Sequence, residues 1–425
     1  MSEQTIAARR GLSRAVPQSR WFPIGLGIGL FLLLFLVYGA VQRFLVLGHE
    51  ALGTTKEVPW GVFICNYAWA ISSIGLSYIA SFGIVLGIRE FDVIGRRALY
   101  LALLIVIAGA MNVGSDLEQP LRAWHMLLTP HLTAPMGMVA PTLTLYIMLI
   151  SIELYLLIKR GHHDILVKTV AVVAFMAAVL VHSYHGAIFG LTHSREFWYG
   201  PYYPIYFLLS ALFASSAMII FVTVATYKAT GKQMSHRLRN SLSLVGEMLA
   251  YLLCIALFFD YWKMNAAIFG HQKEGMIILK DPVFWVFEVG MTYLIPLALL
   301  LWSRFRDYNK MAVAGALCVF GLWFARWDFI ISGQLVPYLG FTPFTLGGSL
   351  SHLASYTPSL TEIAFTIGSL GFIWTFYVLG VRYLPLDKDE LEGVVEPESE
   401  PLISVYIEPD EHGEKRERGI TGIKS

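Results

Sequence analysis

Ten apolar stretches divide this chain of 425 residues, and each is long enough to cross a lipid bilayer as a helix. A spanning helix needs about 20 apolar residues, because it rises about 1.5 Å per residue through a hydrocarbon core about 30 Å thick. The stretches are residues 22–46, 61–88, 97–114, 136–158, 168–190, 204–227, 241–262, 283–302, 311–331 and 359–383. Hydrophobic residues make up 56% of the chain and charged residues 14%, with a mean hydropathy of +0.60. The sequence predicts an all-α, polytopic membrane protein of about ten helices.

Three segments are expected from the distribution of polar residues. Residues 1–21 form a cytoplasmic N-terminal segment, residues 22–385 the membrane domain and residues 386–425 a polar tail. The first apolar stretch is too long for a signal-peptide core and has no small-residue cleavage site after it, so it is expected to span the membrane. The tail is acidic and has few apolar residues, which predicts a disordered cytoplasmic segment. A docking role for the tail is the alternative interpretation.

Lysine and arginine are concentrated in alternate loops, which predicts the orientation of the chain. Basic residues cluster before the first stretch and after the second, fourth, sixth and eighth stretches. By the positive-inside rule, both termini are expected to be cytoplasmic in a cell inner membrane. The net charge of +1 and the scattered basic residues give no indication of a nucleic-acid partner.

The three cysteines give no indication of a disulfide framework or a metal site. Cys65, Cys254 and Cys318 lie singly within apolar stretches, without a Cys-x-x-Cys spacing. Free cysteine commonly behaves as a small buried hydrophobe. We therefore expect all three side chains to be buried.

Polar and ionisable residues are crowded toward one end of the apolar stretches. A charged side chain at mid-bilayer costs about 2.5–3.5 kcal/mol, so such residues are expected to satisfy one another and to share a purpose. With the predicted orientation this end is the outer face, while Glu153 and Glu247 lie toward the inner face. The crowded residues are Asn66, Asp116, Arg122, His182, His185, Asp260, Glu288, Arg326 and Glu362. They predict a polar pocket near the outer surface.

This mixture of carboxylates, imidazoles and a guanidinium suits the polar head of a quinone whose tail stays in lipid. Quinol oxidation releases two protons with two electrons, so a site needs hydrogen-bond donors and a group that titrates near neutrality. His182 or His185, three residues apart on one helix, could carry protons beside Asp116 or Glu288. The site hypothesis assigns proton handling to Asp116, His182 and His185. Asn66, Tyr67, Arg122 and Arg326 are assigned to the head group.

Structural interpretations stay open for the same residues. The two histidines could be packing residues, Asp116 and Arg122 could form an ion pair that secures a loop, and Asn66 could only bind a neighbouring helix. Glu153 and Glu247 are either snorkelling residues or members of a proton path. The aromatic residues Trp60, Trp124, Trp198, Tyr199, Tyr202 and Tyr203 are expected to mark the outer interface.

Several motifs follow one another along the chain: Val58-Pro59-Trp60-Gly61-Val62 with Asn66-Tyr67, the stretch from Asp116 to His125, Glu153-Leu154-Tyr155, His185-Gly186-Ala187, Gly200-Pro201, Arg326-Trp327 with Gln334, and Pro358-Ser359-Leu360 with Glu362. In this order they resemble the NrfD/PsrC family of quinone-interacting membrane subunits, in its ten-span branch of HybB-, DsrP- and Qrc-type subunits. The family pattern resembles Asp-Leu-Gly-Arg-Pro-x-Arg, and Glu118-Gln119 replaces its Gly-Arg pair here. The resemblance covers nearly the whole chain except the tail.

The resemblance implies two four-helix bundles, made by the second to fifth and the sixth to ninth spans, with the first and tenth spans at the periphery. It implies a quinone or quinol, either menaquinone or ubiquinone, and no haem or iron–sulfur cluster in this chain. The implied partners are an extracytoplasmic iron–sulfur subunit with molybdopterin, hydrogenase or multihaem cytochrome subunits, besides membrane lipid. The resemblance implies that the head group is held from the second and fifth spans. Asn66 approximately matches the polar position on the second span, and Tyr184 or His185 is the nearest equivalent on the fifth. The histidine that close relatives have on the second span is absent here. The site hypothesis therefore depends more on the fifth span and on the stretch from Asp116 to His125.

Taken together, the sequence predicts the quinone- or quinol-binding membrane subunit of a respiratory oxidoreductase complex. A b-type cytochrome is one alternative, with His182 and His185 as haem ligands, although axial ligation normally takes histidines from different helices. A proton-coupled transporter is another alternative, since it also carries intramembrane acids. Transporters favour a site at the membrane midplane, whereas the polar residues here crowd toward one face.

Overall fold

The computed structural model describes residues 21–336 and 353–387, and within them ten helices are long and apolar enough to cross a membrane. The spans are α2 (Trp21–Val41) continued by η1 (Gln42–Val46), α3 (Val62–Ile71) continued by η3 (Ser72–Ile74) and α4 (Gly75–Ile84), α5 (Arg89–Asp116), α7 (Pro135–Arg160), α8 (Ile165–Gly190), α9 (Tyr202–Thr230), α10 (His236–Phe269), η5 (Phe284–Leu294) continued by α12 (Ile295–Ser303), α13 (Tyr308–Ile330) and α14 (Leu360–Tyr383). Short helices in the connections are η2 (Gly48–Ala51), η4 (Pro120–Arg122), α6 (His125–Leu128), α11 (Lys273–Lys280) and η6 (Ser332–Gln334). The predicted all-α membrane architecture is confirmed.

Helix α5 extends beyond its apolar stretch, and two basic residues where the extension meets that stretch are buried. The third span was expected at residues 97–114, but α5 begins at Arg89. Arg96 is buried and donates to the carbonyl oxygen of Leu157, 3.3 Å away. Arg97 forms an ion pair with Asp387, so the start of the predicted tail packs on the membrane domain. The remainder of that tail, residues 388–425, and residues 1–20 lie outside the described part of the chain.

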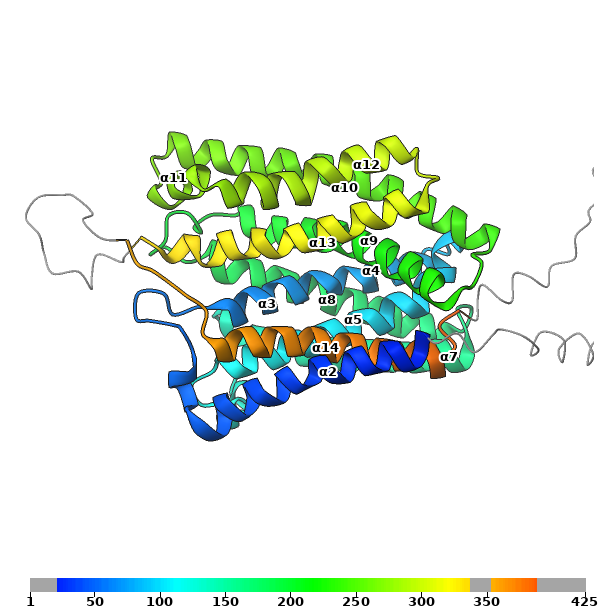
Figure 1. Ribbon diagram of the computed structural model, residues 1–425, viewed down its shortest axis with the longest axis horizontal. Coiled ribbons are helices and arrows are strands. Elements are labelled where there is room, and N and C mark those ends of the chain that lie inside the picture. Colours follow the sequence, from blue (N-terminus) through cyan, green and yellow to red (C-terminus); the bar gives the residue numbers. More distant parts are fainter. Residues whose placement is uncertain (1–20, 337–352, 388–425) are drawn as a thin grey trace, which may run out of the picture.

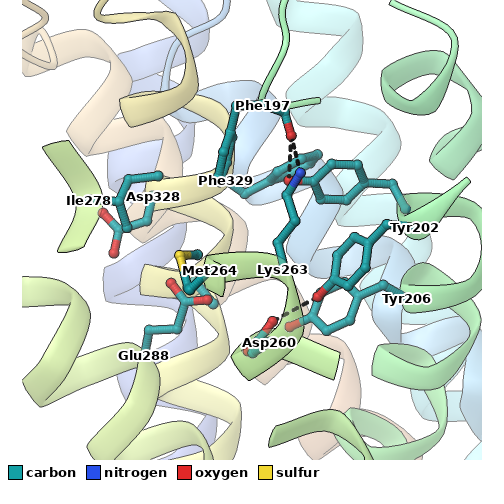
Figure 2. Close-up of a pocket in the computed structure, with 12 residues that line it drawn as sticks. Phe197, Tyr202, Tyr206, Asp260, Lys263, Met264, Ile278, Glu288, Asp328 and Phe329 are labelled. Atoms are coloured by element: carbon teal, nitrogen blue, oxygen red, sulfur yellow. Dashed lines mark hydrogen bonds between the residues drawn. The ribbon is translucent and has the colours of Figure 1, made fainter. Parts of the chain in front are cut away.

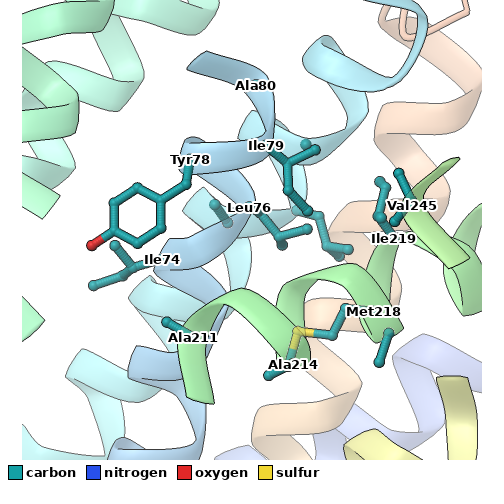
Figure 3. Packing of buried hydrophobic residues seen from close by; sticks show 14 of the residues in the cluster. Ile74, Leu76, Tyr78, Ile79, Ala80, Ala211, Ala214, Met218, Ile219 and Val245 are labelled. Carbon is teal, nitrogen blue, oxygen red and sulfur yellow. The ribbon is translucent and has the colours of Figure 1, made fainter. Parts of the chain in front are cut away.

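The ten spans form two four-helix bundles with two peripheral helices, as the family resemblance implies. The first bundle contains α3/α4, α5, α7 and α8, and the second contains α9, α10, η5/α12 and α13. Helices α2 and α14 pack along each other, and α14 lies on α5 (Figure 1). Where the bundles meet, side chains of α4 such as Leu76 and Ile79 face Ala214 and Met218 of α9 (Figure 3).

The second span is interrupted where it approaches the second bundle. The 3-10 turn Ser72–Ile74 separates α3 from α4, and the carbonyl oxygen of Ser72 accepts a hydrogen bond from Ser215 of α9 at 3.0 Å. Gly75 follows, and a Cβ atom there would lie 2.2 Å from the carbonyl oxygen of Ala211. The absence of a side chain thus lets the two bundles touch at backbone distance. Short 3-10 segments inside helices often mark functional positions.

Glycines also set the contact between the peripheral helices. A Cβ atom at Gly368 would lie 2.1 Å from the backbone nitrogen of Leu36, and one at Gly371 would lie 2.5 Å from the Cβ atom of Leu32. Helices in lipid lack a hydrophobic driving force for association and rely on such close packing of small residues. The pairing of α2 with α14 therefore follows from glycine spacing, although the two helices are far apart in sequence.

The two ends of the bundle differ in what they carry. One end, which we call the α11 end, contains α11 and the C-terminal ends of α5, α8, α10 and α13 (Figure 1). Residues Trp21 and Asp387, the first and last described, lie at the opposite end. The α11 end is the one that the charge pattern of the sequence predicts to be outside.

Candidate functional site

Two buried histidine–tyrosine pairs occupy the interior of the first bundle. His185 and His182 lie on neighbouring turns of α8, and both are almost fully buried. The Nε2 atom of His185 is 2.5 Å from the hydroxyl of Tyr67 on α3, and the Nδ1 atom of His182 is 2.7 Å from the hydroxyl of Tyr78 on α4. His185 lies five residues before the end of α8, so it is about 8 Å from the α11 end. The structure thus brings Tyr67 and His185 together, as the sequence hypothesis required.

Tyr78 was not among the residues that the sequence singled out, although its spacing from Tyr67 could have identified it. It follows Tyr67 by eleven residues, which is close to three helical turns and places both side chains on one face. His182 precedes His185 by three residues, so it meets the tyrosine that lies further from the α11 end.

The hydrogen bonds of His185 determine which of its ring nitrogens carries the proton. Its Nδ1 atom lies 2.6 Å from the carbonyl oxygen of Val181, which can only accept. The Nδ1–H group therefore donates to that oxygen, and the unprotonated Nε2 atom accepts from the hydroxyl of Tyr67. This arrangement leaves His185 as a neutral imidazole whose Nε2 atom can take up a proton.

His182 has partners at both ring nitrogens. Its Nε2 atom lies 3.2 Å from the carbonyl oxygen of Ile71, and its Nδ1 atom lies 3.0 Å from the carbonyl oxygen of Ala178 and 2.7 Å from the hydroxyl of Tyr78. Each ring nitrogen of both histidines therefore already has a hydrogen-bond partner. Axial ligation of haem by either residue would require one of these bonds to break.

Arg326 connects the first bundle with the second. Its side chain is 1% exposed, and it donates hydrogen bonds to Ser72 Oγ at 3.1 Å and to Ser210 Oγ at 2.5 Å. The guanidinium carbon lies 4.5 Å from the centre of the Phe207 ring. Its Nε atom has no hydrogen-bond partner among the described residues. Arg326 is thus a buried cation placed between the histidines of the first bundle and acidic residues of the second.

The acidic residues form a separate group in the second bundle. Asp260, Glu288 and Asp328 line one small cavity together with Lys263 (Figure 2). Asp260 accepts a hydrogen bond of 2.8 Å from the hydroxyl of Tyr202, and Lys263 donates to the carbonyl oxygen of Phe197. The sequence offered Glu288 as a carboxylate beside the histidines. The structure instead places it on the far side of Arg326, because η5 belongs to the second bundle.

Asn66 has a structural role that the sequence left open. Its Nδ2 atom donates to Asn112 Oδ1 at 2.9 Å and to Thr366 Oγ1 at 2.7 Å, and its Oδ1 atom accepts from Trp323 Nε1 at 2.8 Å. These partners come from α5, α14 and α13, so one amide links three other helices. Interhelical bonds of this kind hold membrane helices together. They leave Asn66 with little free bonding capacity for a ligand.

Asp116 ends α5 beside an arginine that the sequence did not single out. Arg43 of η1 donates to the carbonyl oxygens of Ser115 at 2.7 Å and Leu117 at 2.6 Å, where the end of α5 leaves carbonyl groups without helical partners. Asp116 Oδ1 has no hydrogen-bond partner among the described residues. The ion pair of Asp116 with Arg122 that the sequence suggested is absent from the described part of the structure, because Arg122 is exposed in η4.

The carboxylate of Glu362, which lies near Asp116, has hydrogen-bond donors at both of its oxygen atoms. It accepts hydrogen bonds of 2.8 Å from the backbone nitrogens of Gly53 and Ser359, and from the hydroxyl of Tyr356. With Ser359 it forms a capping box at the start of α14. Outside the spans, burial and the negative charge of Glu362 raise the pKa of Tyr356 above its ordinary value. Glu362 therefore anchors the loop before α3 to the start of α14.

The other predicted residues are not gathered at the histidines. Arg122 and His125 are exposed at the α11 end, where His125 stacks on Trp124 with 3.7 Å between ring centres. Tyr184 is half-buried on α8. Glu247 is exposed, whereas Glu153 is fully buried and neither of its carboxylate oxygens has a hydrogen-bond partner among the described residues.

Two general expectations were wrong for particular residues. Trp198 and Tyr203 do not mark an exposed interface, since both are buried, and Trp198 Nε1 donates to the carbonyl oxygen of Phe329 at 2.9 Å. Arg195 secures the same loop, because it donates to three carbonyl oxygens at the end of the ninth span, the closest that of Val336 at 2.8 Å. Of the cysteines, Cys65 and Cys318 are buried, but Cys254 is exposed on the lipid-facing side of α10.

A larger cavity lies in the opposite half of the molecule, between the two bundles and the peripheral helices. It measures about 410 Å³ and is lined by residues such as Trp69, Phe221, Leu370 and Trp374. Among the described residues, no acidic or basic side chain lines it. It can receive an apolar chain, but it lacks the proton-handling groups that a quinone head requires.

Comparisons with known proteins find relatives that align with most of this chain. The chain is 23% identical to a selenate reductase subunit of Mesobacillus selenatarsenatis, over 87% of this chain and 96% of that protein. It is 25% identical to the Hdr-like menaquinol oxidoreductase integral membrane subunit of Archaeoglobus fulgidus, over 81% of this chain and 89% of that protein. It is also 24% identical to a tetrathionate reductase subunit of Salmonella typhimurium, over 71% of this chain and 87% of that protein.

A family model matches more than half of the chain. The match extends over residues 50–338, from the connection before α3 to the end of the ninth span. It includes both bundles, the two histidine–tyrosine pairs and Arg326. The family is described as polysulphide reductase, NrfD. The chain therefore belongs to the NrfD polysulphide reductase family.

Proposed function

We propose that this protein is the quinone- or quinol-binding membrane subunit of an oxidoreductase complex, with the head group bound beside Tyr67 and His185. The observation that carries the proposal is the neutral, buried imidazole of His185, which accepts from a tyrosine hydroxyl about 8 Å inside the α11 end. A quinol hydroxyl has the same donor chemistry as that tyrosine. The name of the relative from Archaeoglobus fulgidus, a menaquinol oxidoreductase subunit, supports menaquinol as the substrate.

In the proposed reaction, His185 acts as the base for quinol oxidation. Its Nε2 atom accepts the proton of a quinol hydroxyl that takes the place of the Tyr67 hydroxyl. The Nδ1–H group stays bonded to the carbonyl oxygen of Val181, which stabilises the imidazolium that forms. Loss of two protons and two electrons converts the quinol to the quinone. In the opposite direction, the same imidazolium returns a proton to the reduced head group.

His182 and Asp116 are proposed to take part in moving the protons. His182 lies one turn deeper than His185 and is bonded to Tyr78, so it can exchange a proton with that hydroxyl. Asp116 lies at the α11 end of α5 with a free carboxylate oxygen, where it can pass protons to water. Arg326, between the bundles, supplies positive charge near the head group without contacting the histidines directly.

The electrons are proposed to pass to an extracytoplasmic iron–sulfur subunit docked on the α11 end. That partner would connect to molybdopterin, hydrogenase or multihaem cytochrome subunits. Arg122 and His125 are exposed at this end and are available to such a partner. The proposed location is the cell inner membrane with both termini cytoplasmic, which places the α11 end outside, in agreement with the charge pattern of the loops.

Binding of a short-tailed menaquinone to the purified protein in nanodiscs tests the proposal. Trp60 and Trp198 stack with 5.4 Å between ring centres, and Trp60 contacts Phe189 one turn beyond His185. A quinone bound at His185 should therefore quench tryptophan fluorescence in a saturable manner. Unlabelled menaquinone should compete, and His185→Ala should weaken the binding. Quenching that rises linearly with quinone concentration, as for simple partition into lipid, would count against the site.

A further inference from the structure

Three carboxylates of the second bundle meet around a cavity with room for about one water molecule. Asp260 of α10, Glu288 of η5 and Asp328 of α13 line this cavity of about 20 Å³ (Figure 2). Their exposed fractions are 7%, 7% and 2%. The Oδ2 atoms of Asp260 and Asp328 have no hydrogen-bond partner among the described residues. Two of the three carboxylates that line the cavity thus each keep one buried oxygen atom without a partner among the described residues.

The charges around the cavity do not balance if all three acids are ionised. Lys263 lines the cavity and lies 4.5 Å from the centre of the Phe197 ring, and Arg326 is the second buried cation nearby. Neither forms an ion pair with the three carboxylates within the described residues. Three negative charges beside two positive charges leave one negative charge without compensation in a medium of low dielectric. An uncompensated buried charge costs several kcal/mol, so the group binds a further positive charge.

The surrounding groups do not remove this imbalance. The other titratable side chains that face the cluster or its lysine are Tyr202, Tyr203, Tyr206, Tyr293, Glu274 and Asp281. The tyrosines are neutral near pH 7. Glu274 lies close to Lys263 as well as to Arg195 and Lys273, and burial raises its pKa, while Asp281 lies close to Asp328. These groups add no cation to the cavity, so the excess of negative charge around it remains.

The missing positive charge is a proton rather than a metal ion. In residues 21–336 and 353–387, no group of three or more histidine, cysteine or acidic side chains is placed to hold a metal. The three acids line the cavity without converging on one coordination point. A proton needs only one carboxylate oxygen, and the unpartnered Oδ2 atoms of Asp260 and Asp328 provide two. The hydroxyl of Tyr202, which donates to Asp260 Oδ1 at 2.8 Å, leaves Oδ2 free for it.

We infer that Asp260, Glu288 and Asp328 form a proton-storage site that holds one exchangeable proton at neutral pH. The proton is bound from water and released to water, so no redox partner takes part. The site lies in the other bundle and exchanges its proton with water, so its occupancy does not require the proposed quinone reaction. Arg326 separates it from the histidine pair, since this cation donates to Ser72 on the side of the first bundle. A change of charge at the acidic cluster therefore alters the electrostatic potential at the histidine pair, and the reverse, because both lie near Arg326.

Infrared spectroscopy of the purified protein in nanodiscs tests this inference without any turnover. A protonated carboxylic acid has a carbonyl-stretch band that shifts in D2O, and the wild-type protein should show one assignable to the cluster at neutral pH. Asp328→Asn should remove that band, because two carboxylates then balance two cations. Lys263→Met should roughly double it, because a second proton is then needed for balance.

Control variants separate the cluster from other acids. Glu153→Gln removes a buried acid of the first bundle and should leave the cluster band unchanged, as should substitution of the exposed Glu247 by glutamine. The variants of Asp328 and Lys263 are expected to change the band in opposite directions, so a folding failure of one leaves the other decisive. Unchanged bands in both variants would overturn the inference. So would a wild-type band that disappears when sodium chloride is added, since a metal cation would then be the occupant.

Discussion

Replacing His185 with alanine should lower the quinone-linked turnover of the assembled complex by about 10²- to 10⁴-fold, the range expected for loss of a general acid–base residue. The Nε2 atom of His185 is the proposed proton acceptor, and its only partner among the described side chains is the hydroxyl of Tyr67. Loss of the imidazole leaves that buried hydroxyl without an acceptor, at a cost of about 1–3 kcal/mol in stability. Steady-state oxidation of a menaquinol by the purified complex, normalised to the amount of assembled complex, measures the effect.

The matched control for this experiment is Ser183→Ala. Ser183 lies on the same helix, and within the described part of the chain its hydroxyl bonds only to the carbonyl oxygen of Val179, at 2.8 Å. Its removal should leave turnover near that of the wild type. Asp116→Ala should also impair turnover if Asp116 carries protons to water. Wild-type turnover in both His185→Ala and Asp116→Ala would contradict the proposed site.

Replacing Arg326 with glutamine should cost about 3–5 kcal/mol of folding free energy, the usual penalty when one member of a buried group of charges is removed. Arg326 compensates part of the negative charge of Asp260 and Glu288. It also donates to Ser72 and Ser210, which join the two bundles. Chemical or thermal unfolding of the purified protein in mild detergent measures the loss.

A second substitution distinguishes charge from packing. Adding Glu288→Gln to Arg326→Gln removes one negative charge as well, so the double variant should recover part of the lost stability. The double-mutant cycle should therefore give a favourable interaction energy between the two positions. Stability of the double variant equal to the sum of the two single losses would show that Arg326 acts through packing alone. If Arg326→Gln were as stable as the wild type, Arg326 would not stabilise the protein by joining the two bundles.

The sequence predicted those features that depend on local periodicity. The ten spans follow from apolar length, and the face of α8 that carries His182 and His185 follows from their separation of three residues. The position of Tyr67 near the start of its span placed it at the same depth as His185. Each of these inferences uses residues that are close together in the chain.

Contacts between distant helices could not be predicted in this way. Asn66 bonds Thr366, 300 residues later, and Arg43 meets the end of α5 more than 70 residues away. Such contacts depend on how each helix is rotated about its axis. A single sequence carries little information about that rotation. Glu288 illustrates the consequence, because the sequence offered it as a carboxylate beside the histidines, whereas it lines a cavity with Asp260 and Asp328. Arg122 and His125 were included for their position after Asp116, yet η4 and α6 leave them exposed.

The position at which a quinone is held tests the central claim most directly. A photoreactive menaquinone analogue can be crosslinked to the complex in nanodiscs, and the modified peptides can be identified by mass spectrometry. We expect labelling in the stretch 62–71 of α3 and the stretch 181–190 of α8, which contain Tyr67 and His185, and loss of that label with excess menaquinone. Competed labelling confined to the apolar cavity between α9 and α14, with none on α3 or α8, would contradict the proposed site.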